Sequence, residues 1–111
     1  MALNSFADVQ AFITQVLQNL GESAGPPHRD FWNTCTYTQF TTGNVPGVTP
    51  SVQILVVGDS KNSNIIQALQ GVGPLFNNDN GTIGQMPFGG PYFTSDQIAE
   101  IAAWIDNNCP E

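Results

Sequence analysis

The chain has 111 residues, of which 41% are hydrophobic and 10% are charged. This length predicts a single domain over residues 1–111, with a core large enough to need no metal ion or disulfide bond. The formal net charge is −7, and Arg29 and Lys61 are the only strong cations. Such a balance excludes the basic stripe of a nucleic-acid binder and favours a basic partner, if the partner is charged.

The sequence also argues against membrane insertion. It has no apolar run of about 18 residues, the length needed to span a bilayer, and an anionic membrane surface would repel the chain. Residues 1–20 contain Asp8 and no Lys or Arg, so they do not resemble a signal peptide. We therefore expect a cytoplasmic protein, or a periplasmic one if a leader has been removed.

In the first half of the chain, apolar residues at helical spacing predict a helix over residues 5–20. Asn4 or Ser5 can cap its start, and Gly21 can end it. Residues 21–30 contain the pair Pro26-Pro27 and predict a loop. A short helix is expected over about residues 30–40, although the Thr-rich sequence there also suits a strand.

In the second half, residues 52–57 taken alone predict a short buried strand, and a helix is expected over about residues 61–70. A long Gly- and Pro-rich loop follows at residues 71–93. The last helix is predicted over residues 95–107, with a capping box from Thr94 and Gln97 and with Trp104 on its flank. Because the single possible strand has no partner, the predicted fold class is all-α.

The cysteines at positions 35 and 109 are the only two in the chain. One interpretation is that Cys35 and Cys109 are buried, reduced, apolar side chains. The other is a disulfide closing a loop of about 75 residues, which would contribute roughly 4 kcal/mol. Two cysteines without a visible secretion signal favour the reduced state.

Three motifs follow one another in the second half. The first is Gly58-Asp59-Ser60-Lys61-Asn62-Ser63 before a helix, the second is Met86-Pro87-Phe88-Gly89-Gly90, and the third is a Thr-initiated helix ending in Trp104-Ile105. In this order and spacing they resemble the small monohaem c-type cytochrome domains common in bacterial multidomain proteins. The resemblance covers about half of the chain. It implies three or four helices with long connections and with the N- and C-terminal helices packed together.

The chain departs from that family at the haem-attachment motif. Family members carry Cys-x-x-Cys-His after the first helix, whereas this chain has Ala24-Gly25-Pro26-Pro27-His28. Thioether attachment needs both thiols, so covalent haem is not expected. The resemblance still implies His28 and Met86 as axial ligands if haem is bound without covalent attachment, a pairing used in electron transfer.

Aromatic residues gather in the two regions that would flank a haem. They can fill the volume that haem would occupy, because an apolar void is costly. Some of them, beside Gly and Pro, also suggest a surface for a ligand or protein partner: Phe31, Trp32, Phe88, Tyr92 and Phe93.

Catalytic and metal motifs are missing from the sequence. It has one histidine and lacks the nucleophile, phosphate-loop and zinc-protease signatures. We therefore expect not an enzyme but a haem-free, cytochrome c-like accessory module that binds another protein or a small ligand. The alternative is an electron-transfer protein that holds haem through His28 and Met86.

Overall fold

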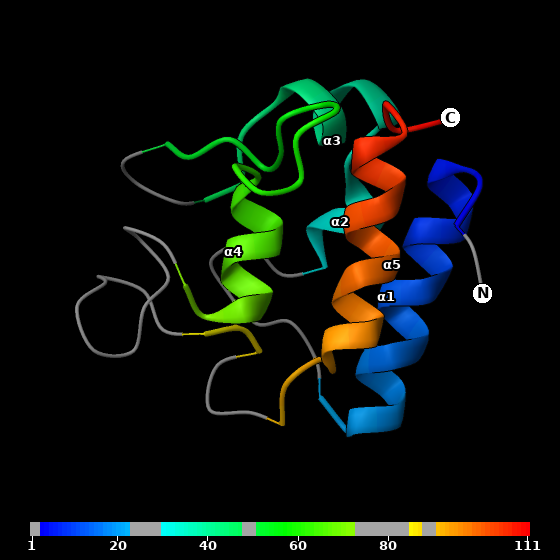
Figure 1. Ribbon diagram of the computed structural model, residues 1–111, viewed down its shortest axis with the longest axis vertical. Helices are drawn as coiled ribbons and strands as arrows, with labels where there is room; N and C mark the ends of the chain where they lie inside the picture. Colours follow the sequence, from blue (N-terminus) through cyan, green and yellow to red (C-terminus); the bar gives the residue numbers. More distant parts are fainter. Residues whose placement is uncertain (1–2, 23–29, 48–50, 73–84, 88–90) are drawn as a thin grey trace.

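The computed structural model describes residues 3–22, 30–47, 51–72, 85–87 and 91–111 of the chain. Within these residues the chain is mostly helical and has no strand; one isolated antiparallel bridge joins Asn44 and Gln53. This confirms the predicted all-α class. The helices, shown in Figure 1, are α1 (Phe6–Leu20), α2 (Phe31–Thr34), α3 (Tyr37–Thr42), α4 (Asn64–Gln70) and α5 (Ser95–Asp106).

Helix α1 follows its local sequence signals closely. Ser5 caps its start, with its hydroxyl accepting a hydrogen bond from the Asp8 N–H. Gly21 ends it in the left-handed conformation, at φ 72°. A glycine is needed there because a Cβ disfavours this conformation. The predicted helix, its Ser5 cap and its Gly21 end are confirmed.

The helix expected over about residues 30–40 is instead two short helices, α2 and α3. The chain is extended at Cys35 and Thr36 between them. Thr36 begins α3 with a capping box, because its hydroxyl accepts from the Gln39 N–H while the Gln39 side chain accepts from the Thr36 N–H. A new N-terminus is therefore more favourable at Thr36 than continuation of α2.

The strand predicted for residues 52–57 is wrong. Ile54 and Leu55 are buried, but Val56 is 36% exposed and Val57 is 44% exposed. The chain turns at this point, since the Asp59 N–H donates to the Val56 carbonyl at 3.0 Å and Gly58 has φ 80°. A hydrogen-bonded turn with positive φ at its third residue is a type II turn.

The ends of α5 agree with the sequence, whereas the position of Trp104 does not. The predicted Thr94–Gln97 capping box is present. At the other end Asn108 has φ 66°, and the N–H groups of Asn108 and Cys109 donate to the carbonyls of Ile105 and Trp104. This is a Schellman motif with Asn in place of Gly. Trp104, expected on the flank, is 1% exposed and lies in the core.

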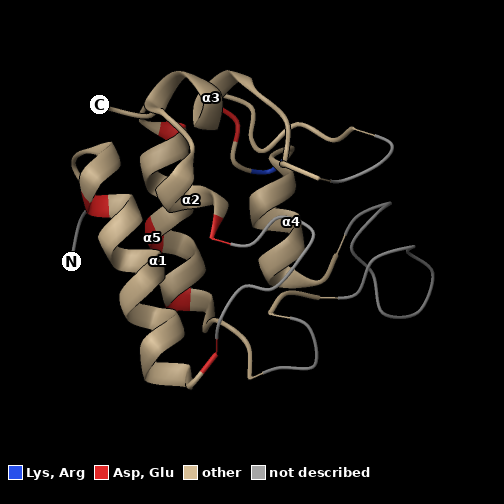
Figure 2. Cartoon of the chain, turned by 180° about the vertical axis from the view of Figure 1, so that it is seen from behind, with Lys and Arg blue, Asp and Glu red and all other residues tan. Residues whose placement is uncertain are grey.

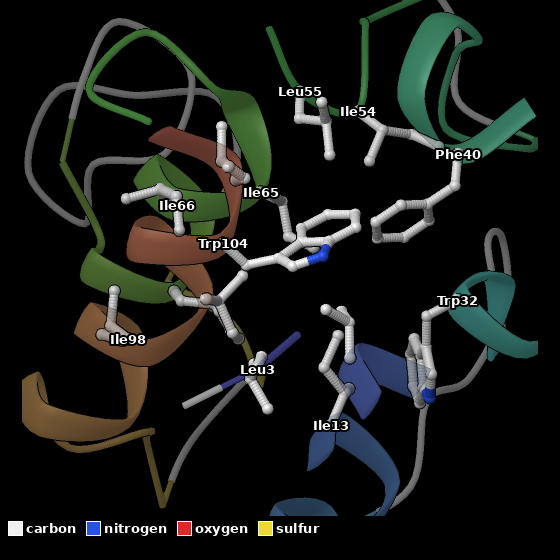
Figure 3. Close-up of a cluster of buried hydrophobic side chains, with 14 of the residues drawn as sticks. Leu3, Ile13, Trp32, Phe40, Ile54, Leu55, Ile65, Ile66, Ile98 and Trp104 are labelled. Atoms are coloured by element: carbon white, nitrogen blue, oxygen red, sulfur yellow. The ribbon is translucent and has the colours of Figure 1, made fainter. Parts of the chain in front are cut away.

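The buried hydrophobic residues form one cluster to which every helix contributes. Phe40 is completely buried, and its ring centroid lies 6.0 Å from that of Phe31, 5.3 Å from that of Phe6 and 6.2 Å from that of Trp104. Figure 3 shows the rings of Trp104 and Phe40 facing one another between α5 and α3. Aromatic side chains thus join the terminal helices to the middle of the chain.

Helix α1 lies beside α5 in Figure 1, and both supply residues to this cluster. Helix α4 packs against α5 as well.

None of the helices in the described parts of the chain is long and apolar enough to cross a membrane.

Candidate functional site

The residues expected to bind haem are placed only in part. His28 and Phe88 lie outside the described residues, as does most of the loop predicted at residues 71–93. Met86 is half-buried at the C-terminal end of α4, where its N–H donates to the Ala68 carbonyl at 2.8 Å. The neighbouring Gln85 side chain donates to the Leu69 carbonyl at 3.0 Å. Two hydrogen bonds, one from the Met86 backbone and one from the Gln85 side chain, thus hold these residues against the last turn of α4.

Most of the described aromatic residues expected at a partner surface are in the core, which corrects that expectation. Phe31 is 8% exposed, Trp32 6% and Phe93 6%. The Trp32 indole N–H donates to the Thr14 hydroxyl, and the Gln10 side chain donates to the Trp32 carbonyl, so both groups are used in joining α2 to α1. Of this set, Tyr92 alone among the described residues is exposed, at 39%.

Residues Gly58 to Ser63 form a turn that is closed around Ser63. Ser63 is completely buried. Its hydroxyl accepts from the Val56 N–H at 2.9 Å and lies 2.8 Å from the Asp59 carbonyl, to which it can donate. This serine therefore satisfies backbone groups on both sides of the turn, and it does so away from solvent.

The same turn is attached to the last turn of α5. The Gly58 N–H donates to the Ile105 carbonyl at 2.9 Å. The Asp106 carboxylate accepts from the Ser60 N–H at 2.8 Å and from the Ser60 hydroxyl at 2.9 Å. The Gly-Asp-x-x-x-Ser segment consequently positions residues 56–60 as a preorganised surface at the C-terminal end of α5.

The charges of the described residues are almost all negative. Figure 2 shows acidic residues on α1, on α5 and on the connections, and a single cation, Lys61, beside the turn. The last turn of α5 carries Asp106 and no basic residue. Because a helix C-terminus is itself a partial negative charge, it adds to the charge of Asp106, and no basic residue within the last turn of α5 offsets the two.

Comparison with protein-family models, with curated proteins and with solved structures gives no match.

Both cysteines are free thiols in the structure, which agrees with the reduced state that the sequence favours over a disulfide. Burial raises the pKa of Cys35, which is half-buried, and raises the pKa of the completely buried Cys109 to about 11. Burial also raises the pKa of Tyr37, whose hydroxyl donates to the Cys109 carbonyl. Neutral buried thiols of this kind are weak nucleophiles.

The buried Cys109 predicts a loss of stability at alkaline pH. Between pH 9.0 and about 11 the unfolded chain releases the thiol proton that the folded chain retains. The folded state then binds more protons, so the free energy of unfolding falls as the pH rises through this range. Urea unfolding at stepped pH values checks this, and Cys109→Ala should show a shallower decline than Cys35→Ala. Equal slopes for the two variants would contradict the assignment.

A depression of about 340 Å³ lies between α2, α3 and the segment that follows, lined by Thr34, Cys35, Gln39, Gly43, Asn44 and Pro46. Its lining is uncharged and about equally polar and apolar. Among the residues that the structure describes, no three His, Cys, Asp or Glu side chains come together in a group that could hold a metal ion.

Sequence reasoning missed the exposed pair Val56-Val57. The β-branched run at residues 52–57 predicted burial along its whole length, whereas burial ends at Leu55. The sequence does predict a turn at Gly58-Asp59-Ser60, but that turn begins at Val56, two residues earlier than the Gly-Asp pair indicates.

Proposed function

We propose that this chain is a haem-free, cytochrome c-like accessory module that acts by binding another protein or a small ligand, and that it is not an enzyme. The observation that carries the proposal is the combination of retained scaffold motifs with a missing attachment motif. The motifs that resemble the cytochrome family all have structural roles here. They supply the turn around Ser63, the contact of Met86 with α4, and the capping box of α5.

The chemistry of the thiols supports the absence of covalent haem. Cys35 follows α2, and Cys109 is completely buried behind α5 with a raised pKa. Thioether formation requires two accessible thiols side by side next to a histidine. These residues do not fit that requirement.

Aromatic packing supports a domain that is complete without a porphyrin. Phe40 contacts the rings of Phe6, Phe31 and Trp104 in the middle of the core. Interiors of folded proteins are packed to crystal-like density, so side chains that already contact one another leave little need for a ligand to complete the core.

The absorption spectrum of the protein purified from haem-supplemented cells tests the proposal. We expect no Soret band, and no saturable band when hemin is added to the purified chain. A Soret band at near-unit haem content would overturn it and would favour the electron-transfer alternative. In that case Met86→Ala and His28→Ala should each shift or abolish the band.

A further inference from the structure

Two neighbouring valines stand out from the rest of the surface. Four large hydrophobic side chains are exposed among the described residues, namely Val56, Val57, Val72 and Tyr92. Only Val56 and Val57 are adjacent in the chain, and they occupy the first two positions of the type II turn. The geometry of that turn depends on Gly58 and needs no apolar residue at its corner. Folding therefore gives no reason for valine at these two positions.

The turn is held rigidly before any partner arrives. Its amide groups donate to the Ser63 hydroxyl, to the Ile105 carbonyl and to the Asp106 carboxylate. A preorganised surface loses little conformational entropy on binding. Since these amides already have acceptors, they are not available to pair with an added strand, and the exposed valine side chains offer the apolar contact.

One carboxylate belongs to the valine turn, and a second is hydrogen-bonded to the residue that follows it. Asp59 closes the turn, and Asp106 is joined to it through Ser60. Glu111 is the C-terminal residue of the chain and follows α5, so it lies near the same end of that helix (Figure 1). Lys61 is the single described cation, and it is on this loop (Figure 2). The acidic residues outnumber it, and the C-terminus of α5 adds to the negative potential.

We propose that Val56 and Val57, together with the carboxylates of Asp59 and Asp106, form a docking surface for a basic segment of a partner protein. The segment carries an apolar side chain between Lys or Arg residues. The apolar side chain contacts the valines, and the flanking cations face the carboxylates. This inference rests on the proposed binding function and specifies the chemistry of the partner.

The test uses the full chain, labelled with ¹⁵N, and a synthetic peptide of alternating Lys and Leu as the probe. A Lys–Ser peptide carries the charge alone, and a Glu–Leu peptide carries the apolar residues with the opposite charge. We expect saturable shifts of the amide signals at residues 56–60 and 105–108 with the Lys–Leu peptide alone. Equal binding of the Lys–Ser peptide, shifts centred elsewhere or no saturable binding would each overturn the proposal.

Matched variants separate this surface from non-specific attraction. Val57→Ser should weaken binding about fivefold through lost apolar contact. Val72→Ser, at an equally exposed valine 46% open to solvent, should leave binding unchanged. Asp59→Asn should weaken binding and reduce its salt dependence, whereas Asp96→Asn in the first turn of α5 should not. Equal losses in a variant and its control would contradict the site.

Failure here is distinguishable from failure of the proposed function. If the peptides do not bind as expected, the docking proposal fails, but the accessory function still stands as long as the absorption spectrum shows no Soret band. A haem-loaded protein would overturn the accessory function whatever the peptides do.

Discussion

Replacing Trp104 with Ala is expected to destabilise the protein by about 3–5 kcal/mol, the range found when large aromatic side chains are removed from cores. Trp104 is 1% exposed, packs on Phe40 and donates its indole N–H to the Pro110 carbonyl at 2.9 Å. The truncation removes this packing and leaves the Pro110 carbonyl without its donor. Urea unfolding followed by far-ultraviolet circular dichroism measures the loss without relying on indole fluorescence.

A domain of this size has a total stability of roughly 5–15 kcal/mol, so Trp104→Ala should lower the midpoint strongly or prevent folding. Trp104→Phe retains an aromatic ring in the core, so we expect it to fold with a smaller loss of stability. It therefore allows the role of Trp104 to be measured even if Trp104→Ala does not fold. Tyr92→Ala removes an exposed aromatic side chain and should change stability by less than about 1 kcal/mol. If Trp104→Phe and Tyr92→Ala were equally mild, Trp104 would not be central to the core.

Ser63→Ala is expected to cost about 1–3 kcal/mol, although it removes only one oxygen atom. The completely buried hydroxyl accepts from the Val56 N–H and lies within hydrogen-bonding distance of the Asp59 carbonyl. Without the hydroxyl these backbone groups stay desolvated and unpaired, which is more costly than the loss of an exposed hydrogen bond. Chemical unfolding of the variant measures the difference.

Ser60→Ala is the matched control, because it changes the same residue type in the same turn. Its hydroxyl donates to Asp106 at the protein surface, where water can replace it. We expect a loss well below that of Ser63→Ala. A comparable loss in both variants would show that the turn depends on its attachment to α5 rather than on the buried serine.

Local sequence signals predicted α1 and α5 because each carries a complete set of them. Ser5 and Gly21 mark the ends of α1, and the Thr94–Gln97 pair marks the start of α5. The same type of signal exists at Thr36 and Gln39 and would have placed the break between α2 and α3. Where the first and last residues of a helix carry such side chains, the helix can be located without knowledge of its neighbours.

Burial, by contrast, depends on contacts between distant segments. Trp32 is buried because Thr14 and Gln10 of α1 bind its polar groups, and Trp104 because Phe40 packs on it. No local pattern encodes these pairings. The exposure of Val56 and Val57 has the same origin, since a strand-like run remains a strand only if another strand lies beside it. The aromatic surface and the buried strand were predicted wrongly for this reason.

Lys61 follows the valine turn and carries the only lysine ammonium group of the whole chain. Apart from the chain's α-amino group, an amine-directed reagent therefore has one possible attachment point, and it adjoins the proposed docking surface. A fluorophore placed there would report on events at the C-terminal end of α5 with little background from elsewhere. Chemical crosslinking through the same amine would likewise sample that face of the molecule in preference to the others.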